Sequence, residues 1–166
     1  MERSQCATVT FVGHSGFMIE ICRKLLVFDY FIDESNVAKS IDISRYDGVY
    51  VFVSHSHHDH FNPEIFKLFP NATFVIANEV KRHCRWANFP ESTIFMKSNS
   101  ELSINDISIN AFSYRGVRFS TPATWTIGIG PTSQRLRKSE KQKAIIRQYF
   151  ATSKPSLTLF RLPCFR

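Results

Sequence analysis

One stretch constrains the possible fold and function of this chain more than any other. It is Ser-His-Ser-His-His-Asp-His at residues 54–60, which holds four of the six histidines. They directly follow the apolar run Tyr-Val-Phe-Val at 50–53, which predicts a buried strand. Asn62 and Pro63 suit the N-cap and the first position of a helix over 63–69. We therefore expect the histidines on a strand-to-helix loop at the carboxyl end of a strand, where open α/β sheets usually hold their functional sites.

The spacing of His55, His57, Asp59 and His60 forms the pattern H-x-H-x-D-H. Imidazole and carboxylate are ligands of a borderline divalent ion such as zinc, and a catalytic site leaves one coordination position open for water. Residues two apart on an extended strand point the same way, so His55, His57 and Asp59 would face one point. His60 would then approach from a turn. Two alternatives are a polar surface loop and a histidine tract that binds metal without catalysis.

Two stretches resemble one superfamily. The string V-F-V-S-H-S-H-H-D-H-F-N-P resembles the metal-binding signature of the metallo-β-lactamase fold hydrolases. The string F-V-G-H-S-G-F from Phe11, followed by L-V-F-D ending at Asp29, resembles their opening hairpin. The resemblance covers about residues 6–112. It implies a four-layer αββα sandwich and a metal-dependent hydrolase, in which a metal-bound hydroxide attacks an ester, amide or phosphoester.

The resemblance also implies roles for individual residues. His55 and His57 would bind one metal ion, while Asp59 and His60 would bind a second, and Asp59 is also the candidate catalytic residue. The expected cofactor is zinc, as one or two divalent ions, with manganese or iron as alternatives. Asp29 closes an apolar strand, so it either orients a metal-bound histidine or caps the following turn. His14 either faces the site or bonds locally within its glycine-rich turn.

The rest of the first 112 residues predicts an α/β (α+β) fold. Expected strands lie at 6–11, 17–20, 25–28, 73–77, 93–96, 102–104 and 107–109, and expected helices at 34–40, 63–69 and 78–86. Asn105 and Asp106 between the last two strands predict a hairpin. We expect residues 1–112 to form the N-terminal, metal-binding half of the sandwich. Its uncovered sheet face would be apolar and would favour self-association.

Residues 113–166 differ in composition. They hold eleven of the 21 Lys and Arg residues and one acid, so the net charge of +7 combines −3 before residue 113 with +10 after it. A basic tail with aromatic residues either binds nucleic acid through its phosphates or forms a solvated, weakly folded extension. We expect this tail to be poorly folded, irregular or partly helical, with 134–149 as the helical candidate. Nucleic acid is not the partner we expect.

A third interpretation is that the tail is an out-of-frame translation. With permitted codons, residues 119–130 read from the third base become F-H-A-G-D-L-D-Y-W-H-W, which is similar to the phrase whose aspartate bridges two metals in the family. The in-frame tail contains no histidine and no aspartate. The chain would then be a truncated, non-catalytic remnant that holds at most one metal ion weakly.

Composition sets the remaining expectations. No apolar run is long enough to span a bilayer and no basic-then-apolar leader is present, so we expect a cytoplasmic protein without a membrane partner. The four cysteines show no C-x-x-C spacing, which favours reduced thiols over a disulfide framework. The small-molecule substrate is not defined by the sequence, because one fold hosts many chemistries.

The coding DNA tests the out-of-frame interpretation directly. Translation of the third-base frame beyond Phe112 should restore H-A-G-D and continue without an early stop codon. A frame that runs quickly into stop codons, or that lacks H-A-G-D, would rule the interpretation out.

Overall fold

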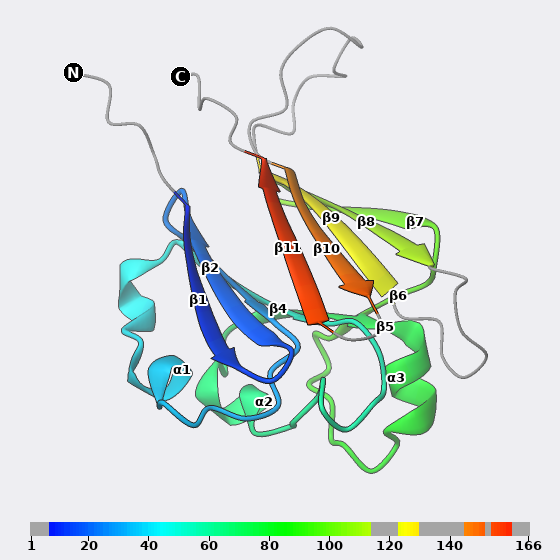
Figure 1. Cartoon of the computed structure of the whole chain (residues 1–166). Helices are drawn as coiled ribbons and strands as arrows, with labels where there is room; N and C mark the ends of the chain where they lie inside the picture. Colours follow the sequence, from blue (N-terminus) through cyan, green and yellow to red (C-terminus); the bar gives the residue numbers. More distant parts are fainter. Residues whose placement is uncertain (1–6, 114–122, 130–144, 152–153, 161–166) are drawn as a thin grey trace, which may run out of the picture. The chain divides into compact units, whose positions relative to one another are not determined.

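The computed structural model describes residues 7–113, 123–129, 145–151 and 154–160, with side chains described through Ala111 (Figure 1). The chain divides into two compact units between Met96 and Lys97. This division lies earlier in the chain than the boundary we expected at residue 112. The reason is that the strands directly after Lys97 pair with later strands rather than with the first sheet.

The first unit contains a six-stranded mixed sheet in the order β1-β2-β3-β4-β5-β6. Its strands are β1 (Thr8–Gly13), β2 (Gly16–Ile21), β3 (Lys24–Phe28), β4 (Gly48–Val53), β5 (Thr73–Ala77) and β6 (Ile94–Met96). The first three strands pair antiparallel, whereas β3, β4, β5 and β6 run parallel to one another. Every strand that the sequence predicts in this region is therefore present.

Burial explains why these segments form strands. Each residue from Tyr50 to Val53 in β4 is at least 97% buried, so both faces of this strand are covered, as in parallel sheets generally. The rings of Phe17, Phe28 and Phe52 occupy partnered positions on β2, β3 and β4. They stack with centroid separations of 4.7 and 4.8 Å. This aromatic ladder joins the antiparallel and parallel parts of the sheet.

The helices of this unit are short: α1 (Val37–Ser40), α2 (Ile65–Leu68) and α3 (Asn78–His83), with a 3-10 turn η1 (Ile43–Arg45). The helix expected at 63–69 begins only at Ile65, because the Asn62 carbonyl oxygen Oδ1 accepts the Glu64 N–H at 2.9 Å and closes a turn first. Figure 1 shows the three α-helices on the same side of the sheet. Among the described helices, none is long and apolar enough to cross a bilayer.

Parallel pairing brings several chain segments to one edge of the sheet. Phe28 at the end of β3 pairs with Phe52, and Val53 at the end of β4 pairs with Ile76 near the end of β5. The residues that follow these three strands therefore meet at the same edge. The turn between β1 and β2 reaches this edge as well, because Phe17 at the start of β2 pairs with Phe28.

The second unit contains a five-stranded antiparallel sheet in the order β11-β10-β9-β8-β7. Its strands are β7 (Ser100–Ile104), β8 (Ile107–Ser113), β9 (Ala123–Ile129), β10 (Ile145–Ala151) and β11 (Lys154–Phe160). The expected hairpin is confirmed: Ile104 pairs with Ile107, and Asn105 adopts the left-handed conformation with φ of 53°.

The expectation of an irregular or partly helical tail is wrong where the structure describes the tail, because β9, β10 and β11 are paired strands. The helix expected at 134–149 is wrong over residues 145–149, which belong to β10, while residues 134–144 lie outside the described residues. Charge count suggested a solvated extension, but β-branched and aromatic residues recur in these segments and favour strands once β8 offers a pairing edge.

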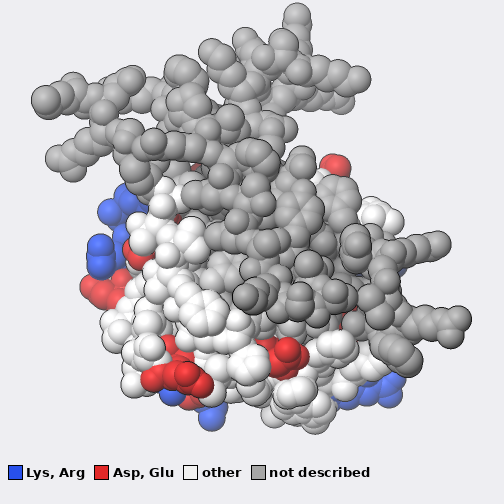
Figure 2. Space-filling model, viewed as in Figure 1, with Lys and Arg blue, Asp and Glu red and all other residues white. Residues whose placement is uncertain are grey.

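Charged side chains are mixed on the visible face of the molecule. Figure 2 shows Asp and Glu interspersed with Lys and Arg over the described part, rather than one basic surface. The first 112 residues carry a net charge of −3, which agrees with this mixture. The basic excess of the chain belongs to residues after Phe112, whose side chains lie outside the described ones.

Two valine substitutions test the burial of β4. Val51 is fully buried at 0% exposure, whereas Val9 on the edge strand β1 is 40% exposed. We expect Val51→Ala to lower the free energy of unfolding by about 2 kcal/mol, and Val9→Ala to lower it by about 0.5 kcal/mol or less. Urea denaturation followed by circular dichroism measures both, and equal losses would contradict the assigned core.

Candidate functional site

The loop after β4 is partly buried rather than a polar surface loop. His55 is 5% exposed and His60 is 8% exposed, whereas His57 and His58 are exposed. Strand β4 ends at Val53, so the alternation that we expected to aim His55, His57 and Asp59 at one point does not continue along the loop. Instead the chain turns back, and the His60 N–H donates to the His57 carbonyl at 3.1 Å.

This turn brings three imidazoles together. The ring of His60 lies 3.7 Å from that of His55 between centroids, and the ring of His57 lies 4.7 Å from that of His55. Asp59 joins the group through His60, with Oδ2 3.7 Å from the imidazole Nε2. The four candidate ligands predicted from the sequence are thus neighbours in one loop.

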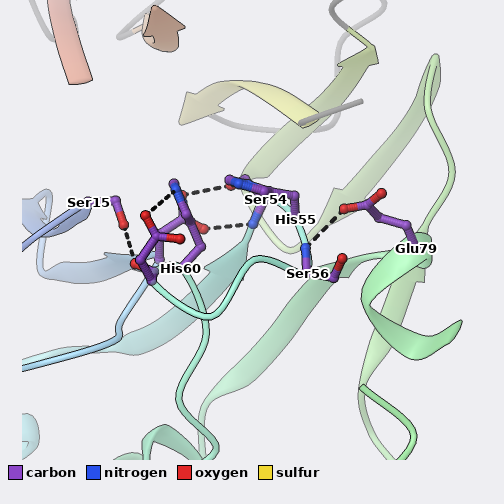
Figure 3. Close-up of polar contacts among 8 residues, drawn as sticks. Ser15, Ser54, His55, Ser56, His60 and Glu79 are labelled. Carbon is purple, nitrogen blue, oxygen red and sulfur yellow. Dashed lines mark hydrogen bonds and ion pairs between the residues drawn. The ribbon is translucent and has the colours of Figure 1, made fainter. Parts of the chain in front are cut away.

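One buried carboxylate holds this loop. Asp29 follows β3, is 1% exposed and adopts φ of 45°. Its Oδ1 accepts the Ser54 N–H at 2.7 Å, and its Oδ2 accepts the Ser54 hydroxyl at 2.8 Å (Figure 3). The same Oδ2 lies 3.1 Å from His60 Nδ1. Because an ionised carboxylate only accepts hydrogen bonds, Nδ1 of His60 carries the proton in this contact.

The Ser54 hydroxyl links His55 to Asp29 and so orients the His55 ring as well. Its oxygen lies 2.9 Å from His55 Nδ1, and its single proton is already donated to Asp29. Ser54 must therefore accept from His55, which places a proton on Nδ1 of that ring too. Both imidazoles then have their ring lone pair on Nε2, a nitrogen that binds metals. Asp29 thus orients one histidine directly and the other through Ser54.

The electrostatic environment favours neutral His55 and ionised Asp59. Burial, followed by the neighbouring His60, lowers the pKa of His55 to about 4, so His55 is neutral near pH 7. Burial opposes ionisation of Asp59, but His60, a backbone hydrogen bond, His58 and His55 together outweigh it and keep the pKa of Asp59 below its usual value. Neutral imidazole and ionised carboxylate are the forms that bind a divalent metal.

The chemistry of the donors therefore fits a divalent ion. Two ligands of one tetrahedral zinc ion lie about 3.4 Å apart, and His60 Nε2 and Asp59 Oδ2 are separated by 3.7 Å. The donor atoms do not all point at one position. Within the described part of the chain, no three His, Cys, Asp or Glu side chains are arranged to hold a metal ion. The loop thus gathers the donors without forming a closed coordination cage.

His14 contacts Phe31. It is exposed, has a left-handed φ of 52°, and its ring meets the edge of Phe31 at 5.5 Å. Phe31 in turn meets the ring of His58 at 5.8 Å. His14 is therefore connected to the loop at its exposed side, through Phe31 and His58.

Sequence reasoning missed three residues that hold the loop. The sequence presents Ser54 only as part of the motif, although the residue connects Asp29 with His55. The Ser15 hydroxyl donates to the Asp59 carbonyl at 2.6 Å, and Glu79 Oε1 accepts the Ser56 N–H at 2.9 Å (Figure 3). For Glu79, its position in the sequence could have indicated the role. Glu79 closely follows a predicted strand whose carboxyl end should lie beside that of β4.

Solved structures resemble this chain in fold. No protein-family model matches the chain. A metallo hydrolase from the archaeon Ignicoccus hospitalis superposes with a TM-score of 0.55 at 16% identity, covering 74% of this chain and 56% of that one. A metallo-β-lactamase fold protein from Bacillus subtilis superposes with a TM-score of 0.50 at 18% identity, covering 72% of this chain and 56% of that one. The chain has part of the metallo-β-lactamase fold. The expected N-terminal half of this fold is thereby confirmed, whereas the expected irregular tail is not.

Sequence comparison points the same way over a shorter segment. A UPF0173 metal-dependent hydrolase from Flavobacterium johnsoniae is 36% identical over 52 residues, which make up 31% of this chain and 23% of that protein. The chain thus spans about half the length of the two solved structures, at 56% each, and its match to the curated relative covers less than a quarter of that protein.

Replacing the central carboxylate tests its role in the loop. Asp29→Asn introduces an amide N–H toward Ser54 or His60, so at least one buried hydrogen bond is lost. We expect the free energy of unfolding to fall by about 1–3 kcal/mol. Asp47→Asn is the matched control, because its side chain is 58% exposed in a surface pair with Arg23 and should change stability little. Urea denaturation compares the two, and similar effects would argue against a buried Asp29 network.

Proposed function

We propose that this chain carries the first metal-ligand cluster of a metal-dependent hydrolase with the metallo-β-lactamase fold. The proposed ligands are His55, His57, Asp59 and His60. The observation that carries the proposal is the contact of His60 Nδ1 with the buried Asp29, repeated for His55 through Ser54. Metal-binding histidines ordinarily donate their second ring N–H to a carboxylate or another oxygen, which sets the tautomer and raises the basicity of the ligand.

A divalent ion bound by this loop would lower the pKa of a coordinated water to about 7 and polarise an ester, amide or phosphoester bond. Zinc suits imidazole and carboxylate donors best, and manganese and iron are the alternatives. The chain itself would contribute orientation and charge. Asp29 and Ser54 hold two imidazoles in one tautomer, and Asp59 supplies the negative charge beside His60. The exposed side of His57 leaves room for a substrate to approach from solvent.

A second candidate is a non-catalytic remnant of such an enzyme. Residues 113–166 contain no histidine and no aspartate, so this part of the chain offers neither a bridging carboxylate nor a later imidazole ligand. The described residues also contain no group of three ligands arranged for a metal ion. Fewer ligands weaken metal binding and leave the water less well placed. We therefore propose at most one weakly held ion and little or no turnover.

Metal titration of the purified chain tests both candidates. Calorimetry with Zn²⁺ should give one weak site, and His55→Ala should weaken binding by about tenfold or more. His83→Ala is the control, because His83 is an exposed histidine on α3 and should leave binding unchanged. Two tightly bound ions per chain would exclude the remnant, whereas no binding, or equal binding by both variants, would refute the proposed metal site.

A further inference from the structure

Helix α3 holds the backbone of Ser56, the residue between His55 and His57. The Glu79 carboxylate accepts the Ser56 N–H at 2.9 Å (Figure 3). The Cys84 thiol lies 4.0 Å from the Ser56 carbonyl oxygen. Both polar groups of the Ser56 backbone are thus contacted from one helix. Nothing in the metal-binding role proposed above requires these contacts.

Helix α3 is attached to the sheet, which fixes the position from which it contacts the Ser56 backbone. Strand β5 pairs parallel with β4, and α3 begins at Asn78, directly after the last residue of β5. Val80 on the same helix is fully buried at 0% exposure, which anchors the turn that presents Glu79. Glu79 therefore reaches Ser56 from a support that is continuous with the sheet beneath the loop.

Cys84 strengthens the same attachment. It is 5% exposed and caps the carboxyl end of α3, where its N–H donates to the Val80 carbonyl at 2.7 Å. Burial, and secondarily the charge of Glu79, raises the pKa of the Cys84 thiol. The thiol therefore stays protonated near pH 7 and serves as a weak donor toward the Ser56 carbonyl.

We infer that Glu79 is a positioning residue that sets the placement of the His55 and His57 imidazoles relative to each other. Fixing the N–H of the intervening residue restrains the backbone dihedrals on both sides of it, and hence the directions of both side chains. Asp29 and Ser54 orient His55 and His60, whereas Glu79 contacts the backbone of Ser56. This inference rests on the proposed metal-binding function of the loop.

Two substitutions separate the hydrogen bond from the helix. Glu79→Ala removes the acceptor while retaining strong helix propensity, so α3 should still form. Glu79→Gln keeps a carbonyl oxygen that can accept the Ser56 N–H. Glu91→Ala is the control for loss of a surface carboxylate, because Glu91 is exposed in the segment after α3. All variants are made in the full chain.

The first measurement needs no metal. Hydrogen exchange of the Ser56 amide, followed by NMR, should be about tenfold faster or more in Glu79→Ala, near the wild-type rate in Glu79→Gln, and unchanged in Glu91→Ala. The His55 and His57 ring signals should shift only in Glu79→Ala. Unchanged exchange and ring signals in Glu79→Ala would overturn the inference, whether or not the chain binds metal.

The second measurement is calorimetric titration with Zn²⁺ alone. Binding should weaken by about tenfold in Glu79→Ala and recover in Glu79→Gln. A wild-type chain that binds Zn²⁺ with the same affinity as Glu79→Ala would overturn the positioning role while leaving the proposed function intact. A wild-type chain that binds no Zn²⁺ would refute the proposed function, and the exchange measurement then decides whether Glu79 positions the two imidazoles.

Discussion

The carboxylate of Asp29 is the interaction on which the loop after β4 depends. A carboxylate that is 1% exposed is stable in the interior only when hydrogen bonds replace its hydration. Ser54 supplies two of these bonds and His60 a third. The requirement is mutual: the buried charge needs donors, and the two histidines nearest to it are obliged to present N–H groups inward. The stability of the loop and the orientation of its histidines thus have one physical cause.

Sheet topology makes this concentration of contacts feasible. Parallel pairing of β3, β4 and β5 places Asp29, the histidine loop and α3 at one edge. The loop is then held from three directions, by Asp29, by Ser15 and by Glu79. Each of these contacts is made to the loop from a neighbouring element, and His57 itself is exposed. A rigid support around the functional side chains is the arrangement that functional sites generally require.

Much of the first unit could be predicted because its strands are dense apolar runs and its histidines are too concentrated for ordinary packing. The roles of Ser15, Ser54 and Glu79 could not, since serine and glutamate occur throughout surface loops and only the pairing of β4 with β5 makes Glu79 a neighbour of Ser56. The strands after Phe112 were missed for a different reason. Positive charge dominates the composition of this segment and favours a solvated extension, whereas strand formation depends on a partner edge.

The most direct test of this account is the tautomer of His55 and His60 in the metal-free chain, measured from the ¹⁵N shifts of the ring nitrogens in long-range ¹H–¹⁵N correlation spectra. Hydrogen bonding to Ser54 and Asp29 predicts that both neutral rings carry their proton on Nδ1. A proton on Nε2 and a bare Nδ1 in either ring would contradict the central role assigned to Asp29.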